Sequence, residues 1–290
     1  MTPATVPIEN ISDTARWVAF YRALESERRD AHFRDPYARR LAGERGEAIV
    51  KAMPQGRAWG WPMVVRTAVM DELIRRTIQR DGAGVVLNLA AGLDARPYRL
   101  PLPEPLRWID VDLPDILAYK CGVLEGERPA CRYESAAVDL RDPAPRRELF
   151  ARAGALGPPV LVLSEGLLVY LAPDEVRSLA ADLHREPALR WWLIDLASPR
   201  LLAMIQRRWG GPLAAGNAPF RFAPAEGTAF FAPLGWREAE FRSTWDESLR
   251  LKRSVPLAWA WDLLSRLGPA RRREESRRMS GIVLLERTSQ

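Results

Sequence analysis

The chain has few of the side chains that build metal centres and disulfide frameworks. Its 290 residues include two cysteines and two histidines, whose positions do not follow a metal-binding pattern. We therefore expect neither a structural zinc site nor a disulfide framework, which suits a reducing cytoplasm. The first nine residues lack a basic segment followed by an apolar run, and no apolar stretch reaches the ~20 residues of a membrane span. These absences predict a cytoplasmic protein without a signal peptide or a membrane partner.

Lysine is also scarce, since it occurs only at positions 51, 120 and 252, so the net charge of +6 comes almost entirely from arginine. A basic chain can indicate a nucleic-acid partner. Here, however, arginines alternate with acidic residues, as in residues 25–30, which is typical of a solvated helix face. The densest arginine run, at 271–273 and 277–278, is interrupted by two glutamates, and we expect an exposed loop or helix end there. Nucleic acid is therefore not the predicted partner.

The most informative segment is an apolar run at 85–89 that leads into the small-residue turn 90–95. A second apolar run follows and ends on Asp112, about 20 residues after the turn. In a βαβ unit this spacing places the turn and the acid side by side at one edge of a parallel sheet. A turn containing Ala90 and Gly92 lets the backbone approach a ligand, and Asp112 can accept two hydrogen bonds from a ribose diol. The segment predicts a pocket for an adenosine-containing cofactor, although Asp112 could also cap the following helix.

The composition of the turn separates two such cofactors. A dinucleotide site favours the pattern G-x-G-x-x-G, with a helix N-terminus on the pyrophosphate. Only Gly92 satisfies that pattern, and Asp94 would place a negative charge beside a pyrophosphate. S-adenosylmethionine carries no phosphate and has a sulfonium cation, so it tolerates both features. The turn favours S-adenosylmethionine, with an NAD-dependent dehydrogenase as the alternative.

Four blocks of sequence resemble the leucine carboxyl methyltransferase family, which includes bacterial polyketide carboxyl O-methyltransferases of the tetracenomycin type. Residues 88–100, NLAAGLDARPYRL, resemble its signature G-A-G-x-D-T-R-x-x-R-L. The acid pair at 110–114 with Lys120, the segment 164–171 and the run at 14–38 resemble its other motifs, and all four occur in family order. In one departure, Ala90 replaces the first glycine of the signature. The added methyl group should press on the approaching cofactor, so we expect weaker binding or a slightly shifted turn.

The resemblance implies the class I methyltransferase (Rossmann-like) fold, an α/β fold with a seven-stranded, mostly parallel sheet whose last strand is antiparallel. The strand candidates are 85–89, 107–111, 132–138, 160–164, 191–195, 236–243 and 281–287. The early ones are continuous apolar runs, as a sheet covered on both faces requires. Helical patterns are found at 13–30, after Trp61-Pro62, and at 114–125, 143–152 and 173–185.

We expect a single methyltransferase domain with four parts. Residues 1–80 would form an N-terminal helical cap, and residues 81–196 the cofactor-binding core. Residues 197–233, crowded with proline, glycine and aromatic residues, fit no simple βα unit and would form an inserted lid. Residues 234–290 would supply the C-terminal strands and a helix. The lid and the N-terminal helices would together cover the methyl acceptor.

The resemblance also implies roles for individual residues around the cofactor. Glu165, just past the fourth strand, would hold the cofactor ammonium group. Asp139 and Leu140 occupy the position of a family pair that contacts adenine, although Asp139 alone reads as a loop aspartate. Arg22 and Arg66 would bind the methionine carboxylate, since a guanidinium fork suits a carboxylate. Either arginine alone would otherwise be read as an exposed helix residue.

The predicted reaction is methyl transfer to the carboxylate of a small aromatic or polyketide-like acid in secondary metabolism. A carboxylate is ionised near neutral pH, its ordinary pKa being about 4, so the predicted mechanism is alignment and needs no catalytic base. Arg96 would pair with Asp94 or with the acceptor carboxylate, and Tyr170 would serve packing or acceptor contact. Alternative acceptors are a hydroxyl group, a protein C-terminus or a tRNA base.

Overall fold

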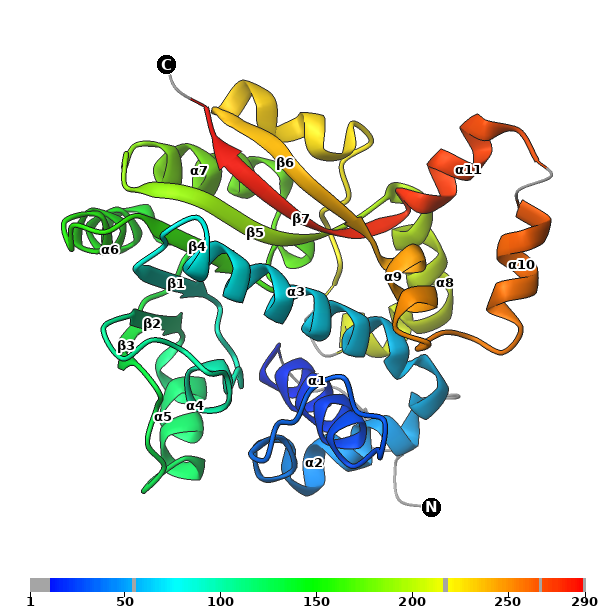
Figure 1. Ribbon diagram of the computed structural model, residues 1–290, viewed down its shortest axis with the longest axis horizontal. Helices are drawn as coiled ribbons and strands as arrows, with labels where there is room; N and C mark the ends of the chain where they lie inside the picture. Colours follow the sequence, from blue (N-terminus) through cyan, green and yellow to red (C-terminus); the bar gives the residue numbers. More distant parts are fainter. Residues whose placement is uncertain (1–10, 54–55, 216–218, 266–267, 289–290) are drawn as a thin grey trace.

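The fold is built on a seven-stranded sheet with the strand order β3-β2-β1-β4-β5-β7-β6 (Figure 1). The computed structural model describes residues 11–53, 56–215, 219–265 and 268–288. The strands are β1 (Val85–Leu89), β2 (Arg107–Asp112), β3 (Arg132–Ala137), β4 (Val160–Ser164), β5 (Leu189–Ala197), β6 (Trp236–Ser243) and β7 (Ser280–Arg287). The first five run parallel to one another, and β7 runs antiparallel to its neighbours β5 and β6. The predicted fold class, including the antiparallel last strand, is confirmed.

Both faces of the central strands are buried, which explains their uninterrupted apolar sequences. Val85, Leu87 and Leu89 of β1 point into one core with the helices α6 (Pro143–Gly154) and α7 (Pro173–His184). Val86 points into a second core formed with α3 (Trp61–Gln79), which crosses the opposite face of the sheet (Figure 1).

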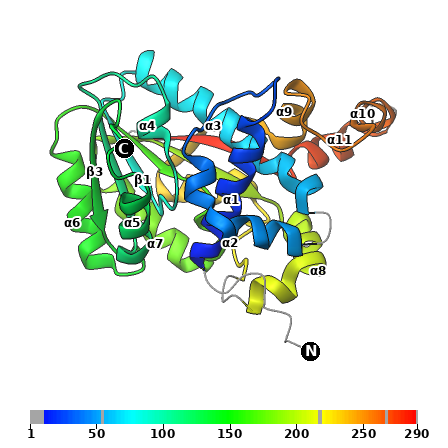
Figure 2. The same cartoon turned by 90° about the horizontal axis from the view of Figure 1, so that it is seen from below.

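The N-terminal helices form a third apolar cluster beside the carboxyl ends of the strands. In it α1 (Ile11–Ser26) packs on α2 (Ala38–Ala52), together with the turn after β1 and α5 (Pro114–Val123) (Figure 2). Helix α1 ends at Ser26, four residues before the predicted end. The sequence patterns did not predict α2, which is divided by a kink at Gly43, where φ is +58°.

The segment predicted as an inserted lid begins with a long helix. Helix α8 (Pro199–Ala215) is followed by a 3₁₀ segment, η3 (Gly227–Leu234). Between β6 and β7 the chain forms α9 (Thr244–Arg250), α10 (Ala258–Ser265) and α11 (Ala270–Arg277), of which α10 stands apart from the sheet (Figure 1). The arginine-rich run predicted as a loop or helix end is therefore mostly helix α11. The remaining short segments are η1 (Gly56–Gly60), α4 (Arg96–Arg99) and η2 (Leu168–Tyr170).

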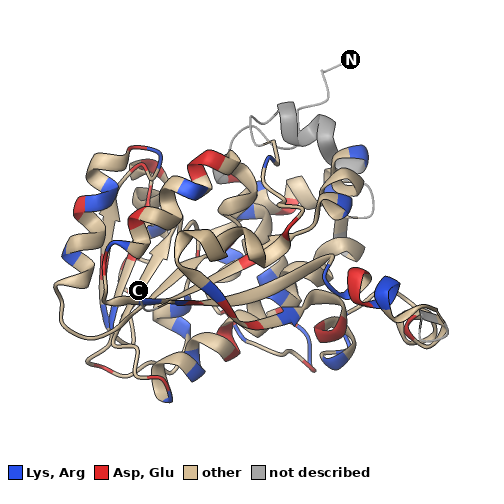
Figure 3. Ribbon diagram, turned by 90° about the horizontal axis from the view of Figure 1, so that it is seen from above, with Lys and Arg blue, Asp and Glu red and all other residues tan. Residues whose placement is uncertain are grey.

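Basic and acidic residues alternate along the described helices, without a stripe of one sign in the view of Figure 3. On α11, Arg271 pairs with Glu275, and Arg278 just beyond the helix pairs with Glu238 and Glu274. This mixing matches the alternation seen in the sequence. Within the described residues, we find no helix that combines the length and apolar character needed to cross a membrane.

Candidate cofactor site

The turn after β1 and the acid at the end of β2 are in direct contact, as their spacing predicts. Asp112 Oδ2 accepts a hydrogen bond from the Gly92 N–H at 2.6 Å, and Oδ1 accepts one from the Leu113 N–H at 2.8 Å. The parallel register places β1 and β2 with their carboxyl ends together. Helix α5 has Leu113 at its N-cap and no side-chain cap. Asp112 therefore holds the turn in place and does not cap the helix.

Two residues of the turn have left-handed backbone conformations. Gly92 has a φ of +50°, and a Cβ atom there would lie 3.2 Å from the Cβ of Ala15. Ala90 has a φ of +53° although it is not glycine. An L-residue in this region costs roughly 1–2 kcal/mol. Ala90, the departure from the family signature, therefore has a strained backbone conformation.

A cavity of about 390 Å³ lies between this edge of the sheet and the helices α1, α3 and α8. Seven of the predicted site residues line it together: Arg22, Arg66, Ala90, Gly92, Asp112, Glu165 and Tyr170. The rest of its wall is mainly apolar, and includes Trp17, Trp59, Trp61, Met63, Leu201, Met204, Ile205, Phe220 and Phe222. The cavity thus has a polar part at the strand ends and an apolar part under the helices.

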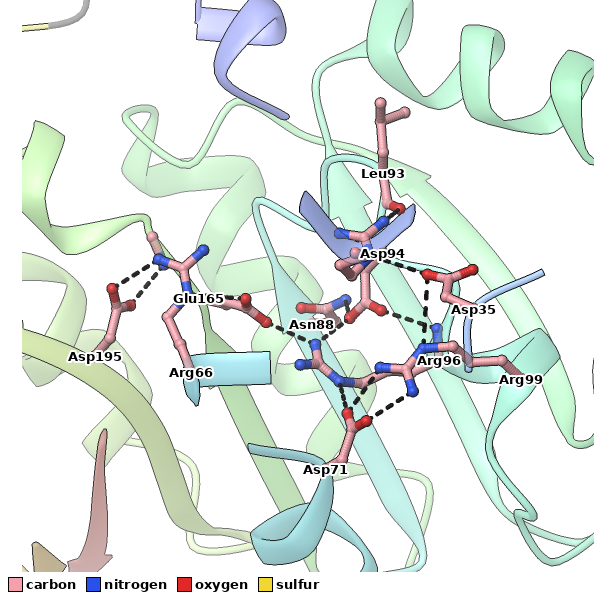
Figure 4. Close-up of polar contacts among 12 residues, drawn as sticks. Asp35, Arg66, Asp71, Asn88, Leu93, Asp94, Arg96, Arg99, Glu165 and Asp195 are labelled. Carbon is pink, nitrogen blue, oxygen red and sulfur yellow. Dashed lines mark hydrogen bonds and ion pairs between the residues drawn. The ribbon is translucent and has the colours of Figure 1, made fainter. Parts of the chain in front are cut away.

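Buried and partly buried ion pairs form a chain (Figure 4), and several of its members line the polar part of the cavity. It begins with Arg22 and Asp35, whose Nε and Oδ2 atoms are 2.9 Å apart. On α3, Asp71 accepts bonds from Arg96 at 2.6 Å and from Arg99 at 2.7 Å. None of these arginines has its side chain in bulk water.

The other half of the chain is centred on Glu165. Its Oε2 accepts a bond from Arg96 at 2.7 Å, and its Oε1 accepts one from Arg66 at 2.9 Å. Arg66 also donates to Asp195 at 3.0 Å, and Arg96 donates to Asp94 at 2.7 Å. Because each central arginine bridges two or three carboxylates, the chain fixes α3, the turn and the ends of β4 and β5 relative to one another.

The ion pairs set the protonation of the cavity carboxylates. Burial opposes the ionisation of Glu165, but the Arg96 and Arg66 guanidinium groups outweigh it and hold its pKa at about 2. Burial is likewise outweighed at Asp94, chiefly by Arg96, and its pKa lies below the ordinary range. At Asp112 burial prevails over the two backbone N–H bonds and raises the pKa.

The arginines predicted to bind the cofactor carboxylate already have partners within the protein. Arg22 donates to Asp35 and to the Leu93 carbonyl oxygen at 2.5 Å, while Arg66 bridges two carboxylates. Both still line the cavity. Of the two roles left open for Arg96, the structure shows the ion pair with Asp94, and Arg96 lies behind the cavity lining.

The predicted adenine contacts, Asp139 and Leu140, do not line the cavity. Asp139 accepts bonds from the Arg141 side chain and backbone N–H, as the simple loop interpretation suggested, and that arginine holds its pKa below the ordinary value. The Leu140 carbonyl accepts from Arg146 at 2.8 Å. Their role toward adenine stays a prediction. Tyr170 lines the cavity and also packs against Phe220, with the two ring centroids 5.3 Å apart.

Sequence reasoning missed the acids that complete the chain, Asp35, Asp71 and Asp195. The other acid of β2 lies away from the cavity. Asp110 is fully buried and accepts bonds from Asn88 at 2.9 Å, from Tyr133 at 3.0 Å and from Lys120. Asp110 and Lys120 are therefore part of the core and do not reach the cavity.

Residues 15–184 match the family model of the leucine carboxyl methyltransferases. The chain belongs to this family. A relative from Frankia alni, named "putative S-adenosyl-L-methionine-dependent methyltransferase", is 33% identical over 258 residues, covering 83% of this chain and 88% of the relative. One of the same description from Streptomyces coelicolor is 38% identical over 188 residues, covering 60% of this chain and 65% of the relative. Family membership identifies an S-adenosyl-L-methionine-dependent methyltransferase and decides against the NAD-dependent alternative.

The fold of this methyltransferase also has solved counterparts. The crystal structure of a DUF574 family protein from Streptomyces avermitilis has a TM-score of 0.61 and covers 95% of this chain and 97% of that one. A Thermobifida fusca structure has a TM-score of 0.57, with 99% of both chains covered. At 15% and 16% identity these likenesses concern the fold.

The residues at the strand ends fit S-adenosylmethionine. A carboxylate offers about four acceptor positions, so Asp112 keeps two for a ribose diol after binding the Gly92 and Leu113 N–H groups. Asp94 and Glu165 on the lining suit a ligand of net positive charge and would repel a pyrophosphate. Ala90 and Gly92 of the turn also line the cavity.

Proposed function

We propose that this methyltransferase esterifies the carboxylate of a small, mainly apolar acid, such as an aromatic or polyketide-like metabolite of the cytoplasm. One observation carries the choice of a carboxylate. Within the described lining of the cavity there is no histidine or lysine, and all four carboxylates already have partners: three pair with arginines, and Asp112 binds two backbone N–H groups. A phenol or alcohol must lose a proton as it accepts the methyl group, whereas a carboxylate is already ionised near neutral pH.

The titratable groups near the cavity support this argument. Neither histidine of the chain lines it, since His32 lies against the Leu251 carbonyl and His184 packs on Trp236. Asp94 and Glu165 are held at low pKa by their arginines and are weak bases. Burial raises the pKa of Tyr170, which keeps its phenol neutral.

The protein would then act by binding the cofactor and the acceptor and aligning them for methyl transfer. When bound, S-adenosylmethionine supplies a methyl group activated by its sulfonium. Asp112 would hold the ribose, and Asp94 with Glu165 would accept bonds from the ammonium group. The walls formed by Trp17, Trp61 and the other apolar side chains would exclude water and orient the acceptor toward the strand ends.

The test is methyl transfer from labelled S-adenosylmethionine to matched acceptors. We would compare 2-naphthoate with 2-naphthol, and separate the products by mild alkali, which hydrolyses methyl esters and spares aryl methyl ethers. The proposal expects alkali-labile label with the acid, and none with an Asp112→Ala control. Label on naphthol alone contradicts carboxyl specificity, and label only on an added tRNA or C-terminal peptide contradicts a small-molecule acceptor.

A further inference from the structure

Negative side chains outnumber positive ones around the cavity. The described lining carries four carboxylates, Asp94, Asp112, Glu165 and Asp195, and two arginines, Arg22 and Arg66. Behind the lining, the ion-pair chain adds two carboxylates and two arginines, which are Asp35, Asp71, Arg96 and Arg99. The excess of two negative charges therefore remains. The site therefore attracts a cation and repels an anion.

The two lining arginines offer little to an incoming anion, because both are already engaged. Arg66 is shared between Glu165 and Asp195, and Arg22 between Asp35 and a backbone carbonyl. The apolar part of the cavity, where an acceptor body would lie, adds no charge among its described residues. An acceptor carboxylate thus finds no uncommitted cation on the described lining.

We infer that the acceptor carboxylate takes its counter-charge from the cofactor sulfonium, so that acids bind only after the cationic cofactor. This rests on the proposed function. In a reactive arrangement the nucleophilic oxygen lies about 3–3.5 Å from the methyl carbon, so the sulfonium is the nearest positive charge. The substrate class is then a monocarboxylic acid with an apolar body, because a second carboxylate would face apolar walls or the lining acids.

Binding titrations can separate cofactor charge from cofactor shape. The protein is saturated either with sinefungin, which has a protonated amine near the sulfonium position, or with S-adenosylhomocysteine, which has a neutral thioether. 2-Naphthoate is then titrated by calorimetry, with the neutral isostere 2-naphthamide as the control. We expect naphthoate to bind the sinefungin complex at least about tenfold tighter, a difference of about 1.4 kcal/mol, and naphthamide to bind both complexes equally.

Equal naphthoate affinity in the two complexes, or no binding to either, would overturn the inference. So would an equal sinefungin advantage for naphthamide, since shape would then explain it. These measurements use the unaltered chain and do not depend on a variant that folds.

A charge variant gives an independent readout. Asp195→Asn leaves Arg66 with one carboxylate partner, so naphthoate should bind the S-adenosylhomocysteine complex several-fold tighter and the sinefungin advantage should shrink. Asp182→Asn is the matched control, because Asp182 pairs with the buried Arg146 outside the cavity lining. A structural effect of breaking a buried pair would weaken all ligands alike and would count against the inference.

The inference and the proposed function fail in different assays. Ester formation together with equal naphthoate binding rejects only the order of binding. Methylation of naphthol, together with sinefungin-dependent naphthoate binding, rejects only carboxyl specificity.

Discussion

Replacing Ala90 by glycine is expected to stabilise this methyltransferase, whereas alanine-to-glycine changes usually cost stability. Ala90 has a φ of +53° in the turn after β1, and an L-residue pays roughly 1–2 kcal/mol for this conformation. Glycine removes that cost but adds roughly 0.4–1 kcal/mol of backbone freedom to the unfolded chain. The net gain in the free energy of unfolding is therefore about 1 kcal/mol. At roughly 2 °C per kcal/mol for a chain of this size, Tm should rise by about 2 °C.

Calorimetric melting of the two proteins measures this directly. The control is Ala151→Gly at an exposed position inside α6, where the same substitution should cost about 1 kcal/mol. Because Ala90 also lines the cavity, we expect the smaller glycine in Ala90→Gly to let S-adenosylhomocysteine bind more tightly. If Ala90→Gly lowers Tm as much as Ala151→Gly does, the argument from a strained left-handed alanine is refuted.

Three further changes probe the site. Asp112→Ala should weaken S-adenosylhomocysteine binding at least tenfold, or about 1.4 kcal/mol, and cost roughly 1–3 kcal/mol of stability because the Gly92 N–H loses its acceptor; unchanged affinity in calorimetry would exclude it from the ribose site. Asp71→Ala should lower the free energy of unfolding in urea by about 3–5 kcal/mol, because two buried arginines lose a partner. The control Asp174→Ala removes a fully exposed carboxylate and should change this free energy by no more than about 0.5 kcal/mol. The pKa of Glu165 is about 2 in the folded protein, against an ordinary 4.5. The ionised carboxylate therefore stabilises the fold fully at pH values above 4.5, and this stabilisation is lost as the pH falls toward 2. This contribution is on the order of 3 kcal/mol, so Glu165→Gln should flatten the acid limb of the stability profile; an unchanged limb would contradict the pairing.

The parts of the structure that depend on local pattern could be predicted from the sequence. The run Val85–Leu89 is apolar at all but one residue because both faces of β1 are covered, and that pattern fixes a central parallel strand. The spacing from this run to Asp112 fixes a contact, because parallel neighbours end at the same edge.

The charge partners could not be predicted, because they are distant in sequence. Arg66 and Asp195 are 129 residues apart, and Arg22 and Asp35 are 13 apart on different segments. The local sequence pattern therefore identifies an arginine as a candidate ligand-binding residue, but it does not show that the arginine already forms an ion pair with a carboxylate of the protein. Helix α8 was missed for another reason: glycine and proline near its end favour a loop, but Leu201 and Ile205 in its first turns pack along the cavity.

The chain of ion pairs restricts how this sequence can change during evolution. Because Arg96 serves three carboxylates on three segments, replacing any one member leaves a buried charge unmatched, and tolerated changes must come in compensating pairs. The apolar wall has no such coupling, and its Met, Leu and Phe side chains can exchange one at a time at modest cost. We therefore expect homologous enzymes to keep the cofactor chemistry fixed while the range of acceptors diversifies.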